Sequence, residues 1–385
     1  MYDLILSGGR VIDPASGTDK MLQIGVSNGH IKTIAEEITG DSTLLIDCSG
    51  CLITPGLIDL HTHVYWGGTS IGVDPDQHAE RSACTTLVDA GTAGAGNMPG
   101  FRNHVIEPAR VRVLPFLNAS YAGIFAFSKT VMVGECENLD LLNADEALKA
   151  TREHQDIVLG IKVRVGASAG GASGIAPMEI ALEVAEEANL PLMCHLDLPP
   201  PSRFDVVSRL RRGDILTHCF KPFPNAPARL RDGKIYQDIL EARNRGVYFD
   251  IGHGAGSFAF NTTRAMLDAG FFPDTISSDI HSISIDGPVY NQLHTMSKFM
   301  ALGMDLHTVI ACASSRPAEV IRRPELGRLE DGGIADISVL RLVDGDFSFE
   351  DTIGEYIVGD QCLRPVATVI GGEFKFCETG STPST

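Results

Sequence analysis

Two histidines separated by one residue, His61 and His63, end an apolar run over residues 52–60. In an extended strand alternate side chains share a face, so the two imidazoles would project together and could bind one metal ion. A histidine pair alone is weak evidence for such a site. Four further residues that could complete it each end a later apolar segment: Lys162, His195, His218 and Asp279.

Taken singly, each of these histidines is better read as an ordinary buried or helix-capping residue. Taken together, a purely structural interpretation would require six polar side chains to lie at equivalent strand ends by coincidence. Catalytic groups of barrel enzymes gather at the carboxyl ends of the strands, where the following loops converge. The set therefore favours a metal-dependent active site at one face of a repeated strand and helix unit.

The elements that would position these residues recur between positions 55 and 323, where apolar strands alternate with helical patterns. Near-continuous hydrophobicity is typical of parallel strands buried on both faces. A helix is expected over 177–188, where Pro177 suits the first turn. Eight strands are predicted, over residues 57–61, 86–89, 113–117, 158–162, 192–195, 215–218, 247–251 and 275–279. Eight such units predict an α/β fold of the (β/α)8 TIM-barrel type.

The two chain ends have a different pattern, with short strands separated by turn residues. Residues 2–51 are predicted to form a meander of short strands in which Asn28 and Gly29 form a hairpin turn. The same pattern of short strands recurs over 337–370. We therefore expect a small β-sandwich domain built from residues 1–54 and 325–377, around a barrel domain of residues 55–324. Residues 378–385 are expected to be a disordered tail.

Composition limits the partners. The chain has 385 residues, 44% of them hydrophobic, and a formal net charge of −18. This acidity argues against a nucleic-acid partner, because phosphate binding rests on clustered Lys and Arg. No apolar stretch approaches the roughly 20 residues that cross a bilayer, which argues against a membrane partner. Nine scattered cysteines and the lack of a signal-like start favour the cytoplasm. A small-molecule substrate is expected, and a homo-oligomer is left open.

With these residues in place, the chain resembles the amidohydrolase superfamily, in the binuclear-metal branch that includes dihydroorotases, hydantoinases and related deacylases. The similarity runs nearly end to end. Its most specific part is the ligand set, and the supporting motifs lie at residues 3–14, 55–63, 315–318 and 332–338.

The resemblance implies two divalent metal ions and a hydroxide that bridges them. His61, His63 and Asp279 would hold one ion, and His195 and His218 the second. Lys162 would bridge both as a carbamate formed with carbon dioxide, since an unmodified ammonium is no metal ligand. Zinc suits such imidazole and carboxylate ligands, although manganese, iron or cobalt could occupy them. The alternative for Lys162 is an amine that merely reaches the barrel mouth.

Three residues are candidates for roles in catalysis. Asp279 would shuttle a proton from the attacking hydroxide to the leaving group, a role compatible with metal binding. Arg164 shares a strand face with Lys162 and could bind a substrate carboxylate or the developing oxyanion, with a salt bridge at the barrel mouth as the alternative. His253, among glycines after the seventh predicted strand, is expected to contact substrate, and a structural or helix-capping histidine is the competing interpretation.

Dihydroorotases commonly carry an arginine two residues after the second metal histidine, and this chain has Tyr65 there. The pattern is more similar to the uncharacterised-deacetylase group, some of whose members cleave acetyl esters of α-hydroxy acids. The resemblance implies a hydrolase that cleaves an N-acyl or O-acyl bond of a small carboxylate-bearing molecule, such as an acetylated α-hydroxy or amino acid. The alternatives are a cyclic amidohydrolase of the hydantoinase or dihydroorotase type and a non-catalytic scaffold relative.

Overall fold

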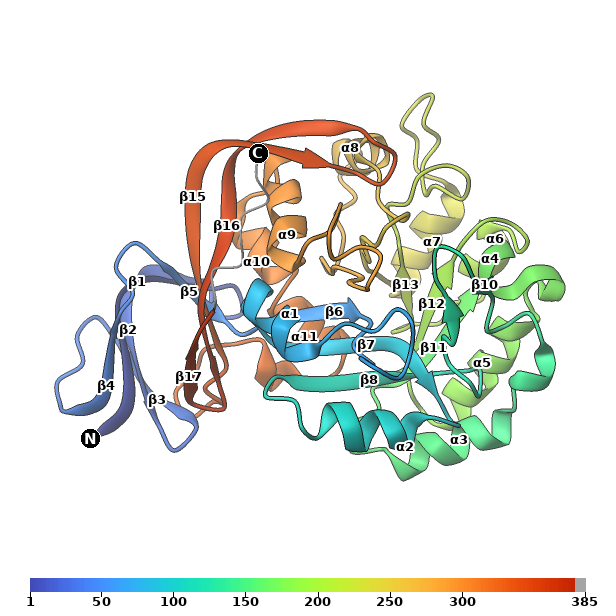
Figure 1. Ribbon diagram of the computed structural model, residues 1–385. Coiled ribbons are helices and arrows are strands. Elements are labelled where there is room, and N and C mark those ends of the chain that lie inside the picture. The colour runs from blue at the N-terminus through green and yellow to red at the C-terminus, as the bar shows by residue number, and fades with distance from the viewer. Residues whose placement is uncertain (378–385) are drawn as a thin grey trace.

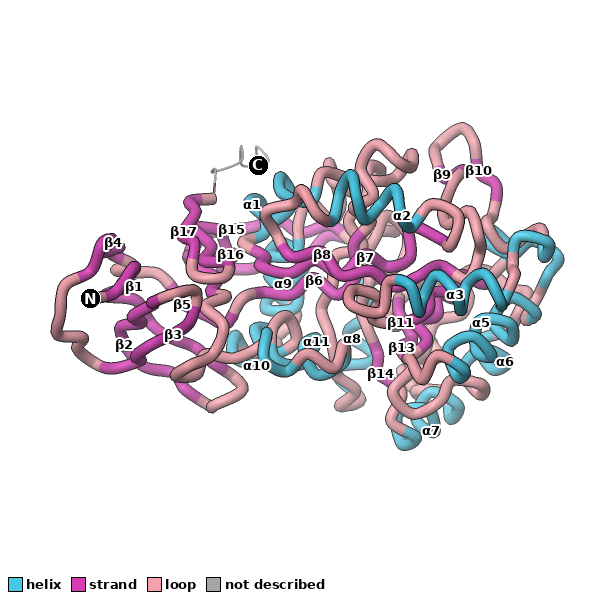
Figure 2. Tube along the Cα trace, turned by 90° about the horizontal axis from the view of Figure 1, so that it is seen from below, coloured by secondary structure: helices cyan, strands magenta, loops and turns pink. Residues whose placement is uncertain are grey.

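The computed structural model describes residues 1–377, and the predicted disordered tail lies outside them. Two sheets organise these residues. A parallel sheet surrounded by helices forms one part of the molecule, and a strand-rich sheet lies at the other end (Figures 1 and 2).

Seven strands make the parallel sheet, in the spatial order β14-β13-β12-β11-β8-β7-β6. Sequential neighbours pair because each strand returns through a crossover connection. Both faces of these strands are buried, which explains their continuous hydrophobicity. The bounds are β6 (Leu57–Thr62), β7 (Cys84–Gly94), β8 (Arg112–Asn118), β11 (Gly160–Val165), β12 (Leu192–Leu196), β13 (Ile215–Thr217) and β14 (Tyr248–Phe249).

The eighth predicted strand, over 275–279, is not a regular strand in the structure. Its segment forms isolated parallel bridges instead, from Thr275 to Asp250 and from Ile280 to Thr62. Asp279 has a φ of 49°, which ends an extended conformation at that residue. The segment therefore lies between the two edges of the parallel sheet without the ladder that defines a strand.

Helices cover the outside of the parallel sheet (Figure 1). The predicted helix over 177–188 is confirmed as α5 (Ala176–Glu187), with proline in its first turn. The other α-helices are α1 (Pro75–Ser82), α2 (Met98–Phe101), α3 (Ala144–Glu153), α4 (Ala167–Gly170), α6 (Arg203–Val207), α7 (Gln237–Arg245), α8 (Phe260–Asp268), α9 (Gln292–Ala301), α10 (Leu306–Ala311) and α11 (Ser315–Val320). A two-stranded hairpin, β9 (Ala126–Phe127) and β10 (Met132–Val133), stands between β8 and α3.

Both chain ends contribute strands to the second sheet. It has eight strands in the order β17-β16-β15-β5-β1-β2-β3, with β4 paired to β1. Their bounds are β1 (Tyr2–Asp13), β2 (Thr18–Ser27), β3 (His30–Ala35), β4 (Ser42–Asp47), β5 (Leu52–Pro55), β15 (Ile337–Glu350), β16 (Tyr356–Ile370) and β17 (Glu373–Phe376). Strand β5 pairs with β15 and leads almost directly into β6, so it connects the two sheets.

The hairpin of β15 and β16 extends beyond its own sheet, over α9 and toward α8 (Figure 1). Its turn is attached to the loop before α8, where the Phe260 amide donates to an Asp351 carboxylate oxygen at 2.9 Å. Among the helices of residues 1–377, none is both long and apolar enough to span a bilayer. All nine cysteines, which lie within this range, are buried and unpaired.

Candidate functional site

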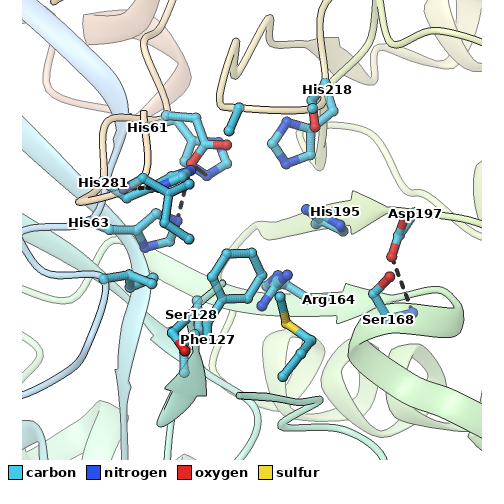
Figure 3. A pocket seen from close by; sticks show the side chains of 18 of the residues that line it. His61, His63, Phe127, Ser128, Arg164, Ser168, His195, Asp197, His218 and His281 are labelled. Atoms are coloured by element: carbon cyan, nitrogen blue, oxygen red, sulfur yellow. Dashed lines mark hydrogen bonds and ion pairs between the residues drawn. The ribbon is translucent and has the colours of Figure 1, made fainter. Parts of the chain in front are cut away.

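A pocket of about 470 Å³ opens at the carboxyl ends of the parallel strands. Figure 3 shows four histidines from three of these strand ends around it. The walls are formed by His61, His63, Ile71, Ile124, Phe127, Ser128, Lys129, Met132, Arg164, Ser168, His195, Asp197, His218, Lys221, Ala255, Gly256, Ser257, Asp279, His281 and Ile283. The pocket therefore brings together five of the six predicted metal ligands, and the sixth, Lys162, is buried directly beneath them.

The tightest group consists of His61, His63 and Asp279, whose potential ligand atoms all lie within 4.8 Å of one another. Asp279 Oδ1 is 3.3 Å from Nε2 of His61 and 3.2 Å from Nε2 of His63. His61 lies near the end of β6 and His63 directly follows the strand, and their spacing places both on one face. The Asp279 amide donates to the His61 carbonyl at 2.7 Å, which ties the carboxylate to the end of β6.

Hydrogen bonds fix which nitrogen of each histidine in this group carries the proton. The Thr217 hydroxyl donates to Asp250 at 2.7 Å, so it must accept from Nδ1 of His61, 2.8 Å away. The Thr92 hydroxyl likewise donates to Asp89 at 2.7 Å and accepts from Nδ1 of His63, also at 2.7 Å. Both Nδ1 atoms are therefore protonated donors. Each Nε2 is left with a lone pair directed at the neighbouring carboxylate of Asp279, as in a metal ligand.

His195 and His218 form the second group, from the ends of β12 and β13. Their ring centroids are 4.4 Å apart, and the His218 ring centroid is 5.0 Å from that of His61. Nδ1 of His218 donates to the Gly252 carbonyl at 2.6 Å, which again leaves Nε2 free. Nε2 of His195 is buried and has no hydrogen-bond partner in the described part of the chain. A buried nitrogen of this kind costs free energy unless a ligand satisfies it, so the second group also suits a metal ion.

Lys162 lies under both groups on β11, fully buried, with its Nζ 3.5 Å from Nε2 of His61. The predicted strand ended at this residue, whereas β11 continues to Val165. Burial lowers the pKa of Lys162 to about 8, lowers that of His63 to about 3, and raises that of Asp279 to about 6. The imidazoles are consequently neutral near pH 7, the state in which they bind metals.

Three glycines allow this crowding. A Cβ at Gly252 would lie 2.4 Å from the Thr217 hydroxyl, and one at Gly254 would lie 2.2 Å from Oδ2 of Asp279. A Cβ at Gly91 would lie 2.4 Å from Cβ of Lys162. Such distances are impossible for ordinary side chains, so glycine at these positions lets the backbone approach the ligands.

Arg164 lines the pocket two residues after Lys162, on the face that strand alternation predicts. Its Nη1 donates to both carboxylate oxygens of Glu135, at 3.3 and 3.1 Å, and both side chains are buried. Its guanidinium carbon lies 4.9 Å from the ring centroid of Phe127. The salt bridge that the sequence left as an alternative is present, and Glu135 already neutralises the charge expected to meet a substrate carboxylate.

His253 does not line the pocket, which contradicts the predicted substrate contact. Its ring is fully buried and stacks on Phe258 with a centroid distance of 4.5 Å. Nδ1 faces the Gly254 carbonyl at 2.9 Å, and Nε2 accepts from Nζ of Lys298 at 2.8 Å. Both ring nitrogens are therefore engaged within the protein, in a ring that packs in the core. The competing structural interpretation is the correct one for His253.

The sequence alone did not reveal several residues that complete the pocket. These include Lys221 and the hairpin of β9 and β10, which contributes Phe127 and Met132. Glu135, which pairs with Arg164 behind the pocket lining, was not revealed either. The carboxylates that orient the histidines were also missed, although Asp250 at the end of an apolar strand was a usable signal. Tyr65 stacks on Phe101 at a centroid distance of 4.7 Å and lies outside the pocket lining.

The chain is similar to known enzymes over most of its length. The chain is 33% identical over 360 residues to a deacetylase from Agrobacterium fabrum, covering 93% of this chain and 87% of that protein. A deacetylase from Enterococcus faecalis is 31% identical over 375 residues, covering 97% and 98%. No family model matches the chain.

Two solved structures are similar over nearly the whole chain. A crystal structure of an adenine deaminase has a TM-score of 0.90 at 31% identity, covering 98% of this chain and 100% of that chain. A dihydroorotase structure has a TM-score of 0.88 at 30% identity, covering 97% of both chains. The protein is a hydrolase acting on C–N or C–O bonds. It belongs to the amidohydrolase superfamily, in the branch of dihydroorotases and hydantoinases, and the family resemblance drawn from the sequence is confirmed.

Proposed function

We propose that this protein is a metal-dependent deacylase that hydrolyses an N-acyl or O-acyl bond of a small carboxylate-bearing molecule, such as an acetylated α-hydroxy or amino acid. The observation that carries the proposal is the buried cluster of His61, His63 and Asp279, with lone pairs of both histidines turned toward the carboxylate. Support for the acyl substrate comes from the two relatives named deacetylase, which match at least nine-tenths of this chain.

The metal assignment follows from the two groups of donors. His61, His63 and Asp279 would hold one divalent ion, and His195 and His218 a second. Lys162, beneath both groups, would join them as a carbamate, and its burial favours the neutral amine that reacts with carbon dioxide. Zinc is the proposed metal, because open sites of imidazole and carboxylate ligands suit it. When bound, the ions would make water more acidic and polarise the scissile carbonyl.

The chain's own groups would then orient the substrate and move the proton. Asp279 is the carboxylate closest to both histidines of β6, and its raised pKa suits a group that takes up and releases a proton near neutral pH. Asp250 and Asp89, acting through threonine hydroxyls, hold His61 and His63 in the tautomer that exposes Nε2. Arg164, with Glu135, would form the polar wall beside the acyl bond.

The surrounding fold supports this assignment. We infer that the parallel sheet, closed by the segment 275–280, is the (β/α)8 barrel of residues 55–324 and that residues 1–54 and 325–377 form the β-sandwich domain. The bridges from this segment to Asp250 and Thr62 support closure. Nine unpaired cysteines support a reducing compartment such as the cytoplasm.

A cyclic amidohydrolase is the second candidate, favoured by the close match to a dihydroorotase structure. Against it, Tyr65 stands where the resemblance expects an arginine, and its ring packs on Phe101 outside the pocket. A hydrolysis screen on metal-loaded protein separates the candidates. It would compare N-acetyl amino acids, O-acetyl α-hydroxy acids, hydantoins and dihydroorotate.

We expect turnover of an acetylated acid and about two metal ions per chain. Turnover of a cyclic amide alone would establish the second candidate instead. Purification without stoichiometric divalent metal, together with no turnover of any substrate, would identify a scaffold and contradict the proposal.

A further inference from the structure

We infer that Lys221 is the residue that binds the carboxylate of the substrate, an inference that rests on the proposed function and names its specificity-determining group. Lys221 lines the pocket together with the metal-binding histidines. Its side chain comes from the loop that follows β13, three residues after His218.

Local hydrogen bonds hold Lys221 in place between two ligand strands. Its amide donates to the His218 carbonyl at 3.2 Å. Its Nζ donates to the Leu196 carbonyl at 2.6 Å, and Leu196 directly follows His195 in the chain. The ammonium is thereby fixed beside both histidines of the second group.

Among the residues that the structure describes, only one of the three N–H donors of this ammonium is used. Within residues 1–377, Lys221 takes part in no ion pair, although its residue is only 8% exposed. The negative charge of Asp197 acts on Lys221 from outside ion-pair distance, and the Asp197 carboxylate accepts a hydrogen bond from the Ser168 amide at 3.2 Å. A buried cation without a partner is costly, so a site that retains one is suited to an anionic ligand that supplies the missing charge.

The other cations of the pocket are less suitable. Arg164 already shares its charge with the buried Glu135. Lys129, on the hairpin between β9 and β10, is exposed, so water and salt screen its charge. Lys221 is therefore the only cationic side chain among the described pocket residues that is both buried and free of a carboxylate partner.

The test compares an acylated acid with its neutral methyl ester on metal-loaded protein. Lys221→Met should lower kcat/KM for the acid by about 10- to 100-fold, the range for a hydrogen bond to a charged group. The ester should be hydrolysed at close to the wild-type rate, with unchanged metal content. Lys221→Arg should retain part of the preference for the acid. Lys129→Met, the exposed matched control, should have a smaller effect that salt abolishes.

Equal losses for acid and ester would show that Lys221 only supports the end of β12, and would overturn the inference. A loss of acid preference in Arg164→Met but not in Lys221→Met would assign the carboxylate to Arg164 and also overturn it.

Failure of the proposed function is distinguishable from failure of this inference. If wild-type protein hydrolyses no acyl substrate, calorimetric titration with N-acetylglycine and N-acetylglycinamide still tests the anion site. Tighter binding of the acid to wild type, lost in Lys221→Met, would support the site without the activity. Equal binding of acid and amide to wild type would refute the site.

Discussion

Two fully buried lysines, Lys162 on β11 and Lys298 on α9, each lie next to a histidine, yet their surroundings differ. Nζ of Lys298 donates to three acceptors: the Pro288 carbonyl at 2.8 Å, the Glu350 carbonyl at 2.6 Å and Nε2 of His253 at 2.8 Å. Within residues 1–377, Nζ of Lys162 has one polar partner, Nε2 of His61 at 3.5 Å. The hydrogen-bonding capacity of the Lys298 amine is therefore satisfied within the protein, and that of the Lys162 amine is not.

Neither burial nor pKa distinguishes the two lysines. Burial lowers the pKa of Lys162 to about 8 and that of Lys298 to about 7. The hydrogen-bond partners do separate them, because three acceptors match the three donors of an ammonium. Lys298 therefore has a structural role, because its hydrogen bonds connect α9 to β15 and to the loop of His253. Lys162 is the amine that remains available for chemistry.

The largest effect is expected for Lys162→Ala. Removing the proposed carbamate should abolish turnover and reduce metal content, measured by elemental analysis and an acyl hydrolysis assay. Added short carboxylates should restore part of both, because they can occupy the space of the missing bridge. Lys298→Met is the matched control and should keep its metal. Equal metal content in wild type and Lys162→Ala would remove the chemical distinction between the two lysines.

Asp279→Asn should have the next largest effect. The amide can still lie near His61 and His63 but cannot accept a proton, so turnover should fall by roughly 10²- to 10⁴-fold. The measurement is kcat at saturating substrate in protein whose metal content matches wild type. Near-normal turnover under these conditions would leave Asp279 with a ligand role only and would place the proton shuttle elsewhere.

Thr217→Val tests how strongly metal binding around Lys162 depends on the orientation of His61. The valine cannot accept from Nδ1 of His61 or donate to Asp250, so metal affinity should fall by about 10- to 100-fold. Competition with a chelator measures this change. Thr263→Val is the control, because among the described residues that buried hydroxyl bonds only the carbonyl of Ala259, the N-cap of α8. A similar loss of metal affinity in both variants would point to general destabilisation.

The smallest effect on chemistry is expected for Lys298→Met. Two carbonyls and Nε2 of His253 would lose their donor, so the free energy of unfolding should fall by about 1 to 3 kcal/mol. Denaturant titration measures the fall, and metal content reports on the site. Loss of metal without loss of stability would contradict the assignment of Lys298 to the structure and of Lys162 to the chemistry.

Much of the site was predictable because its signals are local. The spacing of His61 and His63 within a strand dictates a shared face, and parallel strands place their carboxyl ends at one edge. The histidines at the ends of β12 and β13 could therefore be assigned to one pocket from the amino-acid sequence. The positions of glycines were a further local signal, since Gly252 and Gly254 stand where no Cβ fits.

The sequence by itself determined the alternation of strands and helices and the types of the ligands, because these follow from near-neighbour periodicity. It did not determine which side chains are paired. The sequence offered His253 and Arg164 equally as candidates for substrate contact. Only the folded chain brings Lys298 to His253 and Glu135 to Arg164. Partners separated by 45 and 29 positions meet through tertiary packing, and that packing decides whether a polar group is satisfied or left for a ligand.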